Sequence, residues 1–293
     1  MSRGFLIFAH NNEEIDYTLI ALCNALLIKA NSKEKSVTLV TDKWSHDWMI
    51  EHHGADLVNR AFEHVIFTEL PPVTSRQPRS FHDTYSTKKE LTWNNHGRVT
   101  AYELSPYEET VVVDADYLIM DNSLDHVWGG TSDFMINRNA LTLEHKLPHV
   151  NEIYVDPFSI PMYWATCFYF RKGETAQMMF NMIEHVRDNY EFYQLLYKLP
   201  GRLYRNDYAF SIAIHSLANC IPDGIESLPN PVILTSFDRD ELIDVRHNEL
   251  VFLVNDDEQR WKFRATKVEG LNVHVMNKFS IARMAPKIIE VYG

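Results

Sequence analysis

The chain has few cysteines, and they show no paired spacing. Cys23, Cys167 and Cys220 are scattered over 293 residues, without the close pairs of a zinc site or the regular spacing of a disulfide framework. Free thiols of this kind are typical of proteins from a reducing compartment. We expect all three side chains to lie in or near the apolar core rather than to bind a metal or act as nucleophiles.

Long apolar runs and an excess of positive charge are also missing. A membrane-spanning helix needs about 20 consecutive apolar residues, and no segment of the sequence approaches that length. The first ten residues lack the apolar stretch of a signal peptide. A formal net charge of −12 disfavours broad, non-specific binding to nucleic acid or to anionic membranes. These absences predict a cytoplasmic protein without a membrane span.

The order of the expected elements favours an α/β fold. A hydrophobic content of 45% is enough for a substantial core, in one large domain or two small ones. Asn11 and Glu14 have the spacing of a capping box before an apolar helical repeat. Strands and helices alternate, which predicts a mostly parallel sheet. The expected strands are 4–9, 37–41 and 64–70, and the expected helices are 13–30 and 44–52.

Residues 71–96 interrupt this alternation. The segment is rich in Pro, Ser, Arg, His and Lys, and it has few periodic apolar positions. We expect a long loop, either a solvated surface excursion or a flap near a bound ligand.

Two carboxylates follow a short apolar run of β-branched residues. Asp114 and Asp116 come directly after residues 110–113, Thr-Val-Val-Val. Residues two apart along a strand share a side, so both carboxylates can contact one bound group beyond the carboxyl end of the strand. Such a pair suits a hard divalent cation whose remaining ligands are phosphate oxygens. Acidic pairs also end strands as ordinary solvated turn residues, so the motif alone leaves both interpretations open.

The residues before this pair carry a resemblance. Gly97-Arg98-Val99-Thr100-Ala101-Tyr102-Glu103-Leu104-Ser105-Pro106-Tyr107 reads as a short helix that ends at Ser-Pro and leads into the strand. Residues 97–124 resemble the family 8 glycosyltransferases, glycogenin and its relatives, in which a basic residue, a helix, a turn and a strand lead into Asp-Ala-Asp. The resemblance implies one domain of the GT-A fold over 1–293, with a nucleotide-binding half (1–125) and an acceptor half (126–293).

The resemblance also implies a metal and diphosphate site. Asp114 and Asp116 would bind Mn²⁺ or Mg²⁺ together with His274, and Ala115 would contact the diphosphate between them. Lys278 would neutralise a phosphate, although it lies two positions earlier than in the family pattern. A lone histidine in a strand is more often a structural residue. The expected strand around it runs over 271–279.

Other residues match the family less closely. Arg98 would contact a phosphate or the donor sugar, and Asp207, expected at a helix start with Asn206 as the cap, would orient the donor sugar or the acceptor. The nucleobase and ribose would lie near residues that follow the first strand, namely His10, Asn12, Asp16 and Tyr17. The same residues also suit a capped helix start.

Three positions depart from the family pattern. Trp164 stands in a strand expected over 162–171, where the family has small residues beside the sugar, and it would instead face the core. Tyr208 replaces a glutamine, and Asn277 stands where glycine is expected.

The implied reaction transfers a sugar from a nucleoside-diphosphate sugar, most simply a UDP-sugar, with retention of configuration. The acceptor is left open as a glycan, a protein or a modified DNA base. A faint likeness of the N-terminal segment to proteins of tailed phages would place the chain in the host cytoplasm.

Two other functions stay open. The first is a non-catalytic binding or structural module that keeps the fold, which the three departures favour. The second is a phosphatase of the haloacid dehalogenase type, which also carries Asp-x-Asp after an apolar strand. In those enzymes the motif normally lies on the first strand, whereas here three expected strands precede it.

Overall fold

The computed structural model describes most of the chain. The described residues are 1–12, 14–69, 77–84, 87–93, 97–143, 153–155, 159–199, 204–218, 225–255 and 262–293. Cys220 lies outside them. Cys23 and Cys167 are free and buried, as expected, and burial raises the pKa of both thiols. No helix in these ranges is long and apolar enough to cross a membrane.

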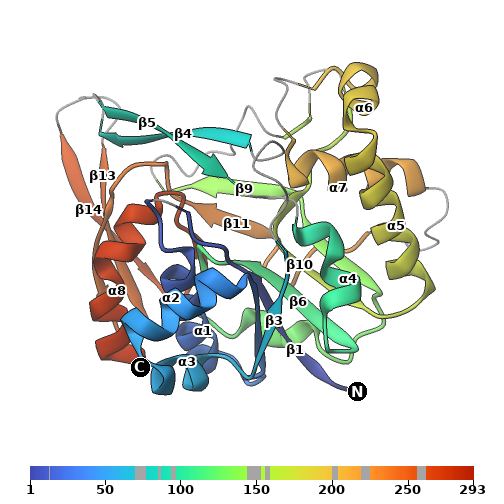
Figure 1. Ribbon diagram of the computed structural model, residues 1–293. Coiled ribbons are helices and arrows are strands. Elements are labelled where there is room, and N and C mark those ends of the chain that lie inside the picture. The colour runs from blue at the N-terminus through green and yellow to red at the C-terminus, as the bar shows by residue number, and fades with distance from the viewer. Residues whose placement is uncertain are drawn as a thin grey trace.

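A six-stranded sheet forms the centre of the fold (Figure 1). Four neighbouring strands are parallel, and β10 runs antiparallel to both of its neighbours. This confirms the α/β class with a mostly parallel central sheet. The sheet order is β3 (His64–Phe67), β2 (Val37–Thr41), β1 (Arg3–Phe8), β6 (Glu109–Asp114), β10 (Trp164–Arg171) and β8 (Phe134–Asn137).

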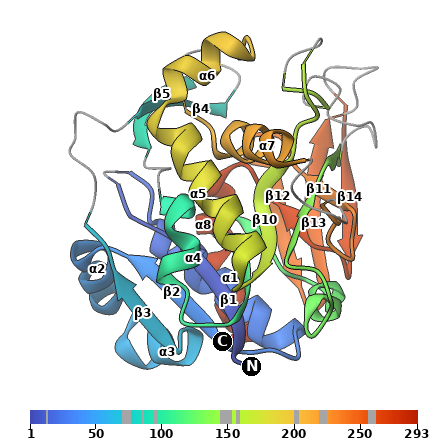
Figure 2. The same ribbon diagram turned by 90° about the vertical axis from the view of Figure 1, so that its right-hand side faces the viewer.

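Helices flank the sheet on two sides (Figures 1 and 2). The last helix packs on the first one, so segments from opposite halves of the sequence lie side by side. One group of helices contains α1 (Tyr17–Asn31), α2 (Lys43–His53), α3 (Ala55–Ala61) and α8 (Lys278–Tyr292). The other contains the 3₁₀ turn η2 (Gly97–Thr100), α4 (Ala101–Leu104), α5 (Glu174–Asp188), α6 (Tyr190–Leu196) and α7 (Asn206–Leu217).

The start of α1 differs from the expected capping box. The helix begins at Tyr17, and the Asp16 carboxylate caps it by accepting from the Leu19 amide at 2.8 Å. Asn12 instead accepts from the amides of Glu14 and Ile15. Glu14 and Ile15, which were expected in the first helical turn, therefore precede the helix and are held by the Asn12 side chain.

Smaller sheets complete the fold. One has the order β7 (Tyr117–Leu118), β15 (Val273–His274), β11 (Val232–Thr235) and β9 (Asn139–Thr142). Another is the antiparallel meander of β12 (Leu242–Arg246), β13 (Glu249–Asn255) and β14 (Phe263–Glu269), against which α8 packs. A further 3₁₀ turn is η3 (Ser123–Val127).

Two further sequence-based predictions of secondary structure were wrong. The expected loop at 71–96 contains an antiparallel hairpin of β4 (Gln77–Thr84) and β5 (Thr87–Trp93). Its strands lack the strict apolar alternation that predicts strands. The expected strand at 271–279 is only the two-residue β15, because Asn277 accepts from the Ser280 amide at 2.9 Å and starts α8.

Candidate metal and nucleotide site

Asp114 is the last residue of β6, at the carboxyl edge of the parallel strands. Its neighbour in the sheet register is Phe8, the last residue of β1. The chain then leaves the large sheet and enters β7 at Tyr117. Ala115 and Asp116 therefore form the connection between two sheets, at the edge where ligands of parallel α/β folds bind.

A buried asparagine from α1 holds this connection. The Asn24 side chain donates to the Asp114 carbonyl at 3.1 Å and accepts from the Ile119 amide at 3.1 Å. Asn24 is fully buried. One side chain thus binds a backbone group before β7 and another after it, which restricts the orientation of the connection that carries the two carboxylates.

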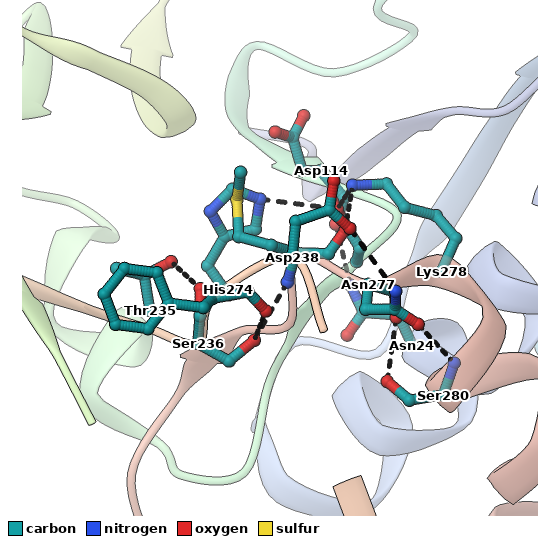
Figure 3. A network of polar contacts seen from close by, with 12 residues as sticks. Asn24, Asp114, Thr235, Ser236, Asp238, His274, Asn277, Lys278 and Ser280 are labelled. Atoms are coloured by element: carbon teal, nitrogen blue, oxygen red, sulfur yellow. Dashed lines mark hydrogen bonds and ion pairs between the residues drawn. The ribbon is translucent and has the colours of Figure 1, made fainter. Parts of the chain in front are cut away.

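Pairing of β7 with β15 brings in the distant histidine. His274 lies opposite Tyr117 in the antiparallel register, and the Val275 amide donates to the Asp116 carbonyl at 2.8 Å. His274 Nε2 lies 3.4 Å from Asp116 Oδ2. One ligand atom from each of Asp114, Asp116 and His274 lies within 4.8 Å of the others. Figure 3 shows Asp114, His274 and Lys278 close to one another. The three residues expected to bind a metal therefore form one cluster.

Two cationic side chains occupy the same cluster. Arg98 Nη2 pairs with Asp114 Oδ1, and Lys278 Nζ pairs with Asp116 Oδ2 and donates to the Met276 carbonyl at 2.8 Å. Burial opposes ionisation of Asp116, but the Lys278 ammonium and the hydrogen bonds from His274 and Lys278 outweigh it and hold the pKa of that carboxyl well below its ordinary value. Burial also lowers the pKa of the Arg98 guanidinium, against the opposing effect of nearby carboxylates. Each carboxylate thus has its own buried cation.

Asp207 connects to the cluster through the backbone of β10. Its Oδ1 accepts from the Ala165 amide at 2.9 Å, while Arg98 Nη1 donates to the Ala165 carbonyl at 3.1 Å. Its Oδ2 pairs with Arg205 Nη2 at 3.0 Å. The expectation that Asn206 caps α7 was wrong, because Arg205 is the cap residue and Asn206 Oδ1 accepts from the Tyr204 hydroxyl. Asp207 and Arg98 therefore bind the amide and the carbonyl of the same residue, Ala165.

The residues expected near the nucleobase have other contacts. His10 Nε2 lies 3.2 Å from Thr68 Oγ1, and Tyr17 is half-buried against the core. Besides capping α1, Asp16 accepts from Trp48 Nε1 at 3.0 Å and pairs with His53 Nε2 at 3.0 Å. Burial opposes ionisation of Asp16, yet its hydrogen bonds to His53, Thr18 and Leu19 lower its pKa to about 2. Asp16 thus joins α1 to α2.

The three departures from the family pattern have structural roles. Trp164 is 5% exposed and belongs to the core, as its alternative interpretation predicted. Tyr208 is buried, with the Arg205 guanidinium 4.9 Å from its ring centroid. Asn277 is fully buried and caps α8. The side chain that replaces glycine therefore positions the helix that begins with Lys278.

Two positioning asparagines were not identified from the sequence. Asn24 is described above. Asn272 Oδ1 accepts from the amides of Met120 and Asp121, and its Nδ2 donates to Asp121 Oδ1 at 2.9 Å. The only local signal was a polar residue inside an apolar run, at Asn24 among the helical repeat. Nothing in the sequence near Asn272 indicated which amides it would bind.

The donor set fits a divalent cation. Two carboxylates and one imidazole are ligands that Mn²⁺ and Mg²⁺ accept, and phosphate oxygens commonly complete the shell. His274 Nδ1 is buried and has no hydrogen-bond partner among the described residues. Since the Nε2 atom faces Asp116, the ring already directs one nitrogen into the cluster.

Comparison with known proteins gives distant structural likenesses. No protein-family model and no curated protein matches the chain. The glycosyltransferase GlyE of Streptococcus pneumoniae TIGR4 has a TM-score of 0.42 at 8% identity, over 78% of this chain and 45% of that one. The chain thus spans less than half of GlyE. Galactosyltransferase LgtC, in complex with donor and acceptor sugar analogs, gives 0.40 at 11% identity, over 76% of this chain and 72% of that one.

A third likeness is to mouse xyloside xylosyltransferase 1 in its apo form. The TM-score is 0.42 at 12% identity, over 78% of this chain and 85% of that one. Likenesses this distant assign no role to any residue of this chain.

Proposed function

We propose that the chain is a metal-dependent glycosyltransferase of the GT-A fold that uses a nucleoside-diphosphate sugar. The observation that carries this proposal is the cluster of Asp114, Asp116 and His274 at the carboxyl edge of the parallel sheet. The first two residues belong to the expected nucleotide-binding half and the third to the expected acceptor half. The site would thus combine residues from both halves of the expected single domain.

Asp114, Asp116 and His274 would hold Mn²⁺ or Mg²⁺. When bound, the cation supplies Lewis-acid stabilisation of the charge that develops on the leaving diphosphate. Arg98 and Lys278 lie beside the carboxylates and would bind phosphate oxygens. The backbone at Ala115, between the two aspartates, would line the diphosphate.

Asp207 would orient the donor sugar or the acceptor. Its carboxylate is fixed by the Ala165 amide and by Arg205, and Arg98 binds the other side of the same residue of β10. The nucleobase and ribose would lie beyond the end of β1, near His10, Asn12 and Tyr17. Because Asp16 already binds the α1 amide, Trp48 and His53, we now propose that it positions this segment rather than contacting the ribose.

Binding and turnover test the proposal. Thermal stabilisation is measured with a panel of nucleotide sugars, UDP-sugars first, in MnCl₂ and in EDTA. Release of UDP is then assayed with and without sugar acceptors. We expect stabilisation and UDP release in MnCl₂ only, and the anomeric configuration of any product tests the retention that the sequence resemblance implies.

Matched variants locate the effect. Asp114→Asn should abolish Mn²⁺-dependent stabilisation. Asp244→Asn should not, because Asp244 lies on the separate β12–β14 sheet and pairs there with Lys287 of α8. Absence of binding by every nucleotide sugar would reject the proposal. Tight binding without turnover would favour the non-catalytic module.

A further inference from the structure

The metal-binding carboxylates already carry internal cations. Asp116, Lys278 and His274 are 6%, 5% and 7% exposed, and the side chains of Arg98 and Asp114 are 18% and 11% exposed. Two carboxylates and two cations therefore balance in charge within one largely buried cluster. Any ligand that enters must replace these pairings or leave a buried charge without a partner.

A divalent cation alone fits this arrangement poorly. Its carboxylate ligands are the two whose negative charges Arg98 and Lys278 already neutralise. Displacing these side chains would leave two positive charges beside a third cation in a poorly solvated place, which is strongly unfavourable. The metal by itself should therefore bind weakly.

A diphosphate alone meets the opposite difficulty. It would draw Arg98 and Lys278 toward its oxygens, but Asp114 and Asp116 would then lie unpaired beside further negative charge. The nucleotide by itself should also bind weakly.

Resting on the proposed function, we propose that Arg98 and Lys278 exchange partners when the two ligands enter together. The carboxylates pass from the side-chain cations to the metal, while the guanidinium and the ammonium pass to the phosphates. Every charge then keeps a partner. The two positive charges of the cation balance the two negative charges of the diphosphate diester in a nucleotide sugar, so the net charge of the cluster does not change. The site therefore binds metal and nucleotide cooperatively, as a pair.

The side chains suit such an exchange. Lys278 has a flexible stem with a compact ammonium, at the start of a helix fixed by the Asn277 cap. The Arg98 guanidinium stays anchored through Nη1 on the Ala165 carbonyl, so only the Nη2 side has to change partner. The exchange thus needs side-chain rotation without movement of β6 or α8.

Calorimetry measures the coupling directly. MnCl₂ is titrated into the protein with and without saturating UDP, and UDP with and without MnCl₂, after correction for the Mn²⁺–UDP complex formed in solution. We expect each ligand to raise the affinity for the other by on the order of 10- to 100-fold, by the same factor in both directions.

Removal of one internal cation tests the cause. In Lys278→Met the Asp116 carboxylate is released, so Mn²⁺ alone should bind more tightly than to the wild type, UDP should bind more weakly, and the coupling factor should fall. Lys287→Met is the matched control, because Lys287 lies on the same helix and pairs with Asp244 away from the cluster. If Lys278→Met does not fold, Arg98→Met is the second variant. It releases the Asp114 carboxylate, so the same changes in Mn²⁺ and UDP affinity are expected.

The outcomes separate the two proposals. Wild-type protein that binds both ligands with a coupling factor near one overturns the exchange and leaves the proposed function standing. Weaker binding of Mn²⁺ alone by the folded Lys278→Met variant also overturns it. Wild-type protein that binds neither UDP nor any nucleotide sugar of the panel, with or without MnCl₂, overturns the proposed function itself.

Discussion

Asp116→Asn should destabilise the fold, and the loss should be recovered in part by Lys278→Met in the same chain. The side chains of Asp116 and Lys278 are 8% and 7% exposed. Removing one partner of a buried pair costs about 3–5 kcal/mol, because the other charge is left in a poorly solvated site, whereas replacing both is often nearly neutral. The coupling energy of the double-mutant cycle should therefore be about 3 kcal/mol or more.

Urea denaturation followed by circular dichroism at pH 7, without metal, measures the four corners of this cycle. The pair of Asp244 and Lys287 serves as a control, and its cycle should show weaker coupling because the two side chains are 21% and 44% exposed. The argument would be refuted if the loss of unfolding free energy in the double variant equalled the sum of the losses in the two single variants. An Asp116→Asn protein as stable as the wild type would also refute it.

The same pair predicts a dependence on pH. The folded pKa of Asp116 lies below its ordinary value, which is about 3.9 in an unfolded chain. The pair therefore contributes its full stability above that value and loses it as the pH falls below about 4. The wild type should lose more stability than the Asp116→Asn variant over this acid range.

Three further variants test positioning and binding. Asn24→Ala should cost about 2–4 kcal/mol in urea denaturation, since it leaves the Asp114 carbonyl and the Ile119 amide unsatisfied, and a loss under 1 kcal/mol would contradict that role. Asp16→Ala should lose about 1 kcal/mol of helix capping at pH 7. Because the Asp16 pKa is lowered to about 2, its contribution is present above pH 4 and lost toward pH 2, so melting temperatures of wild type and variant should converge there. His274→Ala should weaken calorimetric binding of Mn²⁺ with UDP by roughly tenfold or more, and unchanged affinity would exclude His274 as a ligand.

Much of the central sheet could be predicted from the sequence because its strands are buried locally apolar runs. The strand expected at 37–41 is β2 without any shift, and the one expected at 4–9 is β1 within one residue. Asp114 ends β6 as the apolar run before it indicated. In each case a fully buried strand leaves a contiguous apolar signal that does not depend on distant residues.

Helix starts and polar contacts could not be read in the same way. Asn11, Asn12 and Asp16 are all good capping residues, and which of them caps α1 depends on backbone geometry that the sequence does not encode in its periodicity. The sequence pattern predicts Asn277 within a strand because the apolar residues before it continue toward Phe279. Its buried side chain instead caps α8, so a single hydrogen bond separates the two interpretations.

The candidate site lies between these two cases. Its first half follows from one strand end, so local pattern placed Asp114 and Asp116 together. Its second half depends on β7 and β15, two strands of two residues each that leave no periodic signal, and on the Val275 amide that binds the Asp116 carbonyl. His274 could therefore be named only by resemblance, and Lys278, two positions off the expected pattern, reaches Asp116 only because a helix begins where a strand was expected. The residue least well matched to the pattern is thus the one that neutralises the carboxylate at the centre of the cluster.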